Sequence, residues 1–249
     1  MIGQPCYTFA EVPSTMDAAH QLAAEGAPEG ACVLAETQTS GRGRSARQWV
    51  SPQGGIYLSV ILRPTRSLTE WPQLALVAGL AVAQAVNETT KLSPSIRWPN
   101  DVLLNGKKLA GILTEAKSSG YDPRSTIHDP RSYTVVGIGL NVSAGTGLPD
   151  VATALDQHVT PAPDREALTS NLFNWLEQVY DQWNREGFSA VRPGLLRWTG
   201  LFGLMVHLTT GQGTFEGQAV DIDEAGRLLV RLDHGIVRAF DAGEVTLLQ

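Results

Sequence analysis

The run from Leu74 to Val86, LALVAGLAVAQAV, is the feature that most constrains the fold. Apolar side chains cover nearly the whole circumference of this predicted helix, and a helix of that kind has to be buried. It is too short to cross a bilayer. The strand predicted at Ile56 to Leu62, IYLSVIL, has bulky residues on both faces, as expected in a sheet that is covered on both sides. We therefore expect the helix to pack against that sheet.

The composition is that of an ordinary globular protein. A chain of 249 residues with 43% hydrophobic and 18% charged residues fits one large domain plus a small one. The net charge of −6 disfavours a general nucleic-acid binder. Two cysteines and no visible export signal favour a reducing compartment, so we expect a cytoplasmic protein that does not bind membranes. The five histidines lack metal-ligand spacing, and no metal site is predicted.

Capping residues and turn residues predict the remaining elements of the first part of the chain. Ser14 or Thr15 can cap a helix that Gly26 stops, and capping alone would account for both hydroxyls. Asn105-Gly106 is a strong signal for a type I′ hairpin turn. The other expected elements are strands at 31–36, 96–98 and 133–142, an exposed loop at 117–132, and a long helix from Asp164 to Gly187.

The pattern changes after Trp198. From Leu201 to Gln249, short alternating runs are separated by glycines every 8 to 12 residues. This pattern predicts a small all-β module, which we expect to be a five-stranded barrel. The sequence therefore predicts two domains, one over residues 1–199 and one over residues 200–249.

The segment from Gly41 to Arg47, GRGRSAR, is called the basic loop below. Glycines let the backbone come close to a ligand, and guanidinium groups make charge-assisted contacts with carboxylates and phosphates. The loop could be a lid over a small anionic ligand, a solvated flexible loop, or an RGG-like nucleic-acid contact. Because its arginines repel one another, we expect a lid to be mobile when empty and ordered when filled.

A second group of polar residues surrounds the predicted hairpin. Asn100 and Asp101 break a strand after a Trp-Pro pair that could be cis, and Lys107 and Lys108 follow the turn. A lysine directed inward could neutralise a phosphate oxygen, although either lysine could simply be solvated. The sequence contains no Ser/His/Asp order, HExxH, GxGxxG or P-loop motif, so the common hydrolase and nucleotide-binding readings lack support.

Three motifs in this order and spacing, GRGRSARQW, IRWPNDVLLNGKKLAGILTE and VVGIGLNV, resemble the biotin protein ligases. The resemblance covers essentially the whole chain. It implies an α/β (α+β) fold, with a mixed sheet similar to the class II aminoacyl-tRNA synthetase core and an SH3-like C-terminal barrel. It also implies activation of biotin with ATP to biotinyl-5′-adenylate, with Mg²⁺, and transfer of biotin to a lysine of a carboxylase carrier domain. A homodimer is left open.

The resemblance also assigns roles to individual residues. Lys108 and Arg44 would act in catalysis. Biotin would be bound by Ser14, Thr15, Gln38, Gly41, Arg42, Gly43, Arg44, Lys108, Gly111, Gly137 and Gly139, with these last three glycines keeping the pocket floor close to the ligand. The nucleotide would be bound by Arg42, Arg44, Trp49, Asn100, Lys108 and Asn141, with Trp49 packing on the adenine.

The chain departs from the family pattern at three positions. The family usually has Lys at Arg97 and Gly at Ala46, and it often has Asn at Met16. The ligase motifs begin by residue 14, so we expect no N-terminal helix-turn-helix, no binding to DNA and no repressor role. The alternatives are a lipoate ligase or octanoyltransferase, which shares the core fold, and a nucleic-acid binding module.

Overall fold

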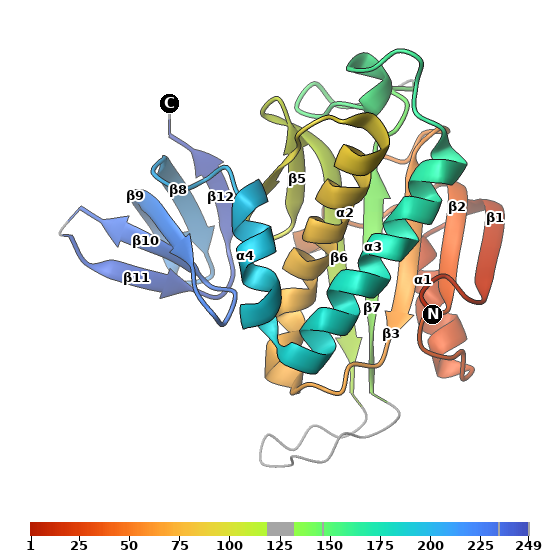
Figure 1. Ribbon diagram of the computed structural model, residues 1–249, viewed down its shortest axis with the longest axis horizontal. Helices are drawn as coiled ribbons and strands as arrows, with labels where there is room; N and C mark the ends of the chain where they lie inside the picture. Colours follow the sequence, from red (N-terminus) through yellow and green to blue (C-terminus); the bar gives the residue numbers. More distant parts are fainter. Residues whose placement is uncertain (119–131, 146, 234, 249) are drawn as a thin grey trace.

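The computed structural model of the chain describes residues 1–118, 132–145, 147–233 and 235–248. They form a seven-stranded mixed sheet, of order β1-β2-β3-β7-β6-β5-β4, and a smaller five-stranded sheet beside it (Figure 1). Only the β1–β2 pair of the larger sheet is parallel. Its strands are β1 (Cys6–Val12), β2 (Cys32–Gln38), β3 (Ile56–Leu62), β4 (Ser95–Arg97), β5 (Asp101–Leu104), β6 (Lys107–Lys117) and β7 (Tyr133–Leu140).

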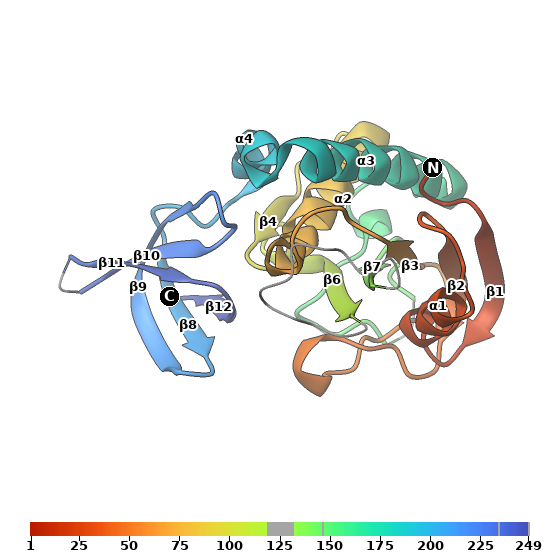
Figure 2. The same cartoon turned by 90° about the horizontal axis from the view of Figure 1, so that it is seen from below.

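Helices cover both faces of the larger sheet, as Figure 2 shows. On one face α2 packs against the sheet and α3 packs on α2, while α1 lies on the opposite face against β2, β3 and β7. The helices are α1 (Thr15–Ala24), α2 (Leu74–Thr90), α3 (Arg165–Glu186) and α4 (Phe188–Trp198). The predicted buried helix is confirmed, because all but one of the side chains from Leu74 to Val86 are buried.

Strand β3 carries bulky side chains on both faces because helices cover both of its sides. Leu58 and Val60 belong to the large core under α2 and α3, whereas Ile61 belongs to a second core under α1. Side chains alternate between the faces of a strand, so a strand with helices on both sides is buried at every position and is mostly apolar. Every residue of β3 is buried.

The predicted hairpin joins β5 to β6. Asn105 has φ 51° and Gly106 has φ 78°, so both turn residues have the positive φ that a type I′ turn requires. The turn places Lys107 and Lys108 at the start of β6, where Lys107 is exposed and Lys108 is half-buried. Trp98-Pro99, just before β5, is a cis peptide bond.

The C-terminal residues form the five predicted strands in an antiparallel sheet of order β11-β10-β9-β8-β12. Within the described residues the backbone pairings do not join β11 to β12, so they do not close the sheet into a complete ring. The strands are β8 (Met205–Thr210), β9 (Gly213–Ile222), β10 (Leu228–Leu232), β11 (Val237–Phe240) and β12 (Glu244–Leu247).

Buried aromatic and polar side chains join the smaller sheet to the rest of the protein. Trp98 is buried, and its Nε1 donates to the carbonyl oxygen of Gly226 at 3.0 Å. From α4, Arg192 contacts both carboxylate oxygens of Asp221, at 2.7 and 2.6 Å. The apolar side chains of both sheets belong to one continuous core cluster. This packing holds β12 beside the larger sheet.

Two elements were not predicted from the sequence. Strand β1 is an edge strand whose residues are mostly exposed, so it lacks the alternation that marks a half-buried strand. Helix α4 contains Pro193, a residue that normally argues against a helix interior. The loop predicted at 117–132 lies mostly outside the described residues. None of the described helices is long and apolar enough to cross a membrane.

Candidate active site

A cavity of about 370 Å³ lies between the larger sheet, the basic loop and strand β12. Its wall brings together segments that are far apart in the chain: the start of α1, the end of β2, the basic loop, strands β5 to β7, and residues 244–246. All of the candidate residues line this cavity except Ser14 and Gly41. Gly41 lies instead in a neighbouring hollow on the outer side of the basic loop.

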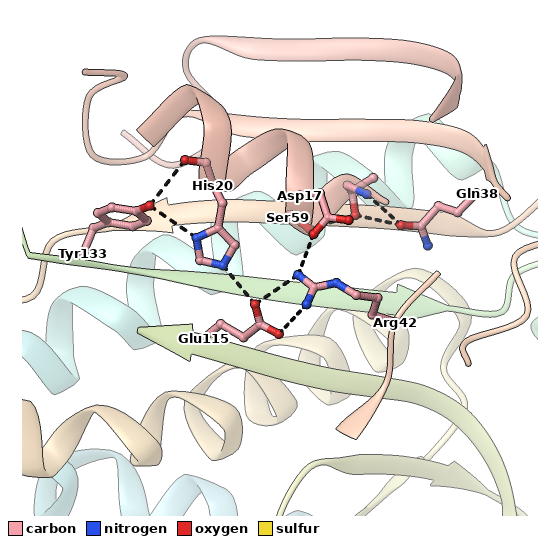
Figure 3. Close-up of polar contacts among 8 residues, drawn as sticks. Asp17, His20, Gln38, Arg42, Ser59, Glu115 and Tyr133 are labelled. Atoms are coloured by element: carbon pink, nitrogen blue, oxygen red, sulfur yellow. Dashed lines mark hydrogen bonds and ion pairs between the residues drawn. The ribbon is translucent and has the colours of Figure 1, made fainter. Parts of the chain in front are cut away.

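One end of the cavity is uncharged and hydrogen-bonded in a defined direction. The Oε1 atom of Gln38 accepts from the backbone N–H of Thr15 at 2.8 Å and from the Thr15 hydroxyl at 3.1 Å. Ser59, fully buried on β3, donates to the Thr15 hydroxyl at 2.8 Å, and Gln38 Nε2 donates to Ser51 Oγ at 2.8 Å. Gln38 and Ser59 are labelled in Figure 3. The network fixes the orientation of the Gln38 amide, because each of its ends already has a matching partner.

The hydroxyls of Ser14 and Thr15 do not serve as helix caps. Ser14 occupies the N-cap position of α1, but its side chain makes no capping hydrogen bond. Its Oγ is buried and has no hydrogen-bond partner within the described part of the chain. Thr15 bonds to Gln38 instead. The expectation that capping accounts for these hydroxyls is therefore wrong, and an orphaned buried hydroxyl is a reason to look for a ligand nearby.

The arginines of the basic loop already have partners within the protein. Arg42 binds Glu115 through both terminal nitrogens, at 2.8 and 3.0 Å, and also contacts Asp17 at 2.9 Å (Figure 3). Arg47 contacts Glu244 of strand β12 at 2.5 Å. The expectation of mobility rested on arginines that only repel one another, and that premise is wrong for Arg42 and Arg47, because both pair with acidic groups from distant parts of the chain.

Arg44 is the most enclosed arginine of the loop. Its Nη1 donates to Asn100 Oδ1 at 2.7 Å, and its Nη2 donates to the carbonyl oxygen of Gly243 at 3.3 Å. Burial lowers the pKa of Arg44 below its ordinary value, and the carboxylate of Asp101 partly opposes this effect. Neither hydrogen-bond partner of Arg44 is charged, so its charge remains available to an anion in the cavity.

Lys108 lines the same cavity as Arg44. Its Nζ is 2.5 Å from Asp101 Oδ1 and 5.4 Å from the centre of the Trp49 ring. Arg97 contacts the other oxygen of Asp101 at 2.7 Å, so one carboxylate holds two cations. The Arg97 departure from the family pattern thus places a guanidinium beside Asp101, at the cavity wall.

Protein side chains cover the three glycines at the cavity wall: Trp49 lies over Gly111 and Gly139, and Met16 lies over Gly137. Gly111 and Gly139 are paired across β6 and β7. A Cβ at Gly139 would lie 2.3 Å from Trp49 Cε2, and one at Gly111 would lie 2.8 Å from Trp49 Cζ3. A Cβ at Gly137 would lie 2.5 Å from Met16 Sδ. The glycines therefore make room for the side chains of Trp49 and Met16 here, and the expectation that they keep the pocket floor close to a ligand stays a prediction.

The two asparagines at the cavity wall hold backbone segments together. Asn100 Nδ2 donates to the carbonyl oxygen of Ile112 at 3.0 Å. Asn141 is buried, and its Nδ2 donates to the carbonyl oxygen of Thr153 at 3.1 Å. Both amides therefore shape the cavity.

Sequence reasoning did not identify the acidic partners of the cations, which are Asp17, Asp101, Glu115 and Glu244. Asp101 and Glu115 both lie in the quoted motif IRWPNDVLLNGKKLAGILTE, and these positions were the available signal. The other pairings depend on contacts between distant segments, for which a single sequence offers no local signature.

Comparison with known proteins places the site in a family context. Residues 8–127 match the Biotin/lipoate A/B protein ligase family, and residues 201–248 match the Biotin protein ligase C terminal domain. The Bifunctional ligase/repressor BirA of Bacillus subtilis is 37% identical over 97% of this chain and 74% of that protein. The Biotin--[acetyl-CoA-carboxylase] ligase of Paracoccus denitrificans is 33% identical over 90% of this chain and 92% of that protein.

Solved structures show the same arrangement of elements. The biotin protein ligase from Aquifex aeolicus in complex with biotin and ATP has a TM-score of 0.81 to this chain, at 28% sequence identity. The alignment covers 98% of both chains. The likeness therefore extends over the larger sheet, the helices and the small C-terminal sheet together.

Proposed function

Because this chain belongs to the biotin protein ligase family, we propose that it activates biotin with ATP and transfers the biotinyl group to a lysine of a carboxylase biotin carrier domain. This is the activity of a biotin--[biotin carboxyl-carrier protein] ligase. Biotin and ATP are the proposed substrates, because the similar Aquifex aeolicus ligase is in complex with both.

One observation supports this proposal most directly: the cavity has an uncharged hydrogen-bonding end and a cationic end. Thr15 and Gln38 lie at the first end, where a ureido group could exchange hydrogen bonds with them. Arg44 and Lys108 lie at the second end, where a carboxylate and a phosphate would find charge-assisted donors. Biotin carries a ureido head and a carboxylate on a short apolar chain, so one molecule matches both ends.

In the first proposed step, a carboxylate oxygen of biotin attacks the α-phosphorus of ATP. The bond from that phosphorus to the bridging oxygen breaks, and pyrophosphate leaves. Negative charge grows on the α-phosphate oxygens in the transition state, and Lys108 and Arg44 stabilise it because both are already held at the cavity wall. In the second step the neutral amine of the carrier lysine attacks the acyl carbon. AMP leaves, an amide forms, and the nitrogen loses one proton to solvent.

The remaining candidate residues have proposed binding roles. Thr15, Gln38 and the buried Ser14 would bind the ureido end, and Asn100 and Asn141 would shape the nucleotide end. The indole of Trp49 would pack on the adenine with one face, while its other face rests on the paired glycines of β6 and β7. The backbone of the basic loop, Gly41 to Arg44, would close over the carboxylate and phosphate.

Mg²⁺ would have to be held mainly by the phosphates of ATP. Within the described residues, no group of three or more His, Cys, Asp or Glu side chains could hold a metal ion. Magnesium usually keeps several waters and is bound through one or two carboxylates together with substrate phosphates. Asp101 is the carboxylate nearest to Lys108 in the cavity, and it is already shared by two cations.

The C-terminal region favours biotin over lipoate as the substrate, because residues 201–248 match a domain described for biotin protein ligases. We propose residues 1–199 as the biotin- and ATP-binding domain and residues 200–249 as a domain that completes the cavity through Glu244, Val245 and Thr246. The net charge of −6 favours a ligase over a nucleic-acid binding module.

The experiment is to mix the protein with ATP, Mg²⁺ and a biotin carrier domain, and to supply biotin or lipoate in parallel reactions. Mass spectrometry of the carrier should show one biotinyl group on one lysine. A carrier whose lysine is changed to arginine should stay unmodified. Modification by lipoate but not by biotin, or no modification under conditions where a known biotin ligase succeeds, would contradict the proposal.

A further inference from the structure

The guanidinium of Arg42 is held by a cluster of side chains outside the cavity, which we call the anchor: Arg42, Glu115, Asp17, His20 and Tyr133 (Figure 3). The two terminal nitrogens of Arg42 lie 2.8 and 3.0 Å from the two oxygens of Glu115. Asp17 contacts Nη2 at 2.9 Å. A planar guanidinium bound at two points by one carboxylate has little freedom to rotate.

Glu115 is itself held in place. His20 Nε2 lies 3.0 Å from Glu115 Oε2, and His20 Nδ1 lies 3.4 Å from the hydroxyl of Tyr133. Burial lowers the pKa of His20, so the imidazole is neutral near pH 7 and has one N–H. A carboxylate can only accept, so this proton lies on Nε2 and Nδ1 is left as an acceptor. The single proton of the Tyr133 hydroxyl is shared between His20 Nδ1, at 3.4 Å, and the carbonyl oxygen of His20, at 3.3 Å. The Glu115 carboxylate is thus held by His20 of α1, and His20 is held in turn by Tyr133 of β7.

The net charge of the anchor shows whether Arg42 can attract an anionic ligand. Arg42 contributes +1, Glu115 and Asp17 contribute −1 each, and neutral His20 contributes nothing, so the cluster sums to −1. A cluster with this sum does not attract an anion. Anionic ligand groups are therefore left to Arg44 and Lys108, of which only Lys108 has a carboxylate partner, one already shared with Arg97.

The position of the anchor connects it to the uncharged end of the cavity. Asp17 and His20 belong to α1, the helix that begins with Thr15. Arg42 lies four residues after Gln38, the hydrogen-bond partner of Thr15. Arg42 lines the cavity together with these two residues. Holding Arg42 against α1 therefore sets the spacing between the basic loop and the groups proposed to bind the ureido head.

We propose that Glu115 is a positioning residue, which holds Arg42 so that the basic loop stays at the correct distance from the biotin end of the cavity. This inference rests on the proposed function and assigns Arg42 the role of an anchor instead of a phosphate ligand. It predicts that losing Glu115 weakens biotin binding and makes the backbone around Arg42 more mobile. The chemistry at Arg44 and Lys108 should continue.

The test compares Glu115→Gln, Arg42→Lys and the control Glu70→Gln in the full chain. Glu70 also pairs with an arginine, at 2.7 Å, and does not line the cavity. Two quantities are measured: the KM for biotin and the kcat in biotin-dependent pyrophosphate exchange, and the rate of trypsin cleavage at position 42 without ligand. Losing a charge-assisted hydrogen bond should raise the KM about tenfold. Cleavage at position 42 should be several times faster in both anchor variants, with kcat within about threefold of wild type.

Three outcomes would overturn the inference. Wild-type KM and cleavage rate in both anchor variants would show that the anchor positions nothing. A large fall in kcat with an unchanged KM would show that Arg42 acts on the reacting phosphate. Equal changes in Glu70→Gln would show a general loss of stability. The cleavage assay needs no substrate, so it still tests the anchor if the proposed ligase activity fails. If Glu115→Gln does not fold, the KM and the cleavage rate of Arg42→Lys alone test the inference.

Discussion

Replacing Lys108 with methionine tests the charge that is proposed to act during adenylate formation. Methionine keeps most of the aliphatic stem that packs near Trp49 and removes the ammonium group. Asp101 would keep its contact with Arg97 at 2.7 Å, so the substitution leaves no buried carboxylate without a partner. We therefore expect a stability loss of less than about 1 kcal/mol.

The expected effect on activity is larger. A hydrogen bond to a charged group contributes about 1.5–3 kcal/mol, and about 1.4 kcal/mol corresponds to a factor of ten in rate. Lys108→Met should therefore slow adenylate formation by about ten- to 150-fold. The assay is biotin-dependent exchange of labelled pyrophosphate into ATP, which reports the first step without a carrier protein.

The neighbouring lysine provides the control. Lys107 is exposed, belongs to the same hairpin and does not line the cavity. Lys107→Met should change the exchange rate less than about twofold. Equal losses in the two variants would show that the hairpin responds to any change, and an undiminished rate in Lys108→Met would show that its charge does not act in this step. Either result would refute the role assigned to Lys108.

Three further predictions follow from the packing. Gly139→Ala should displace the Trp49 indole, because the new Cβ would lie 2.3 Å from its ring, and Trp49 fluorescence would report the shift. Trp98→Phe should cost about 2–3 kcal/mol in urea unfolding, since it leaves a gap and an unpaired Gly226 carbonyl between the sheets. Burial lowers the pKa of His20 in the folded protein. As the pH falls through about 6.5, His20 therefore binds a proton in the unfolded chain before it does so in the folded one, and the folded protein loses stability. His20→Gln should therefore lose less stability than wild type between about pH 7 and about pH 5, measured by urea unfolding.

Local patterns determined much of the fold. The turn at Asn105-Gly106 follows from the positive φ that both residues tolerate, and it places Lys107 and Lys108 at the start of β6. The helix at Leu74 and the strand at Ile56 follow from apolar periodicity, because a continuous apolar surface must be buried. The three motifs were sufficient to indicate the family, and the cavity brings most of their candidate residues together.

Other features were decided only by the tertiary structure, because they depend on the approach of residues that are far apart in the chain. Arg42 and Glu115 are 73 positions apart, and their pairing turns an arginine that was expected to repel its neighbours into a fixed anchor. Trp49 meets Gly111 and Gly139 only after β6 and β7 have paired, so the sequence could suggest a close approach to these glycines but not by which group. The sequence predicted the Ser14 hydroxyl as a helix cap, whereas in the folded protein this hydroxyl is buried and has no hydrogen-bond partner within the described residues. Periodicity and capping act over a few residues, whereas the charge balance and shape of the cavity depend on which distant segments the core brings together.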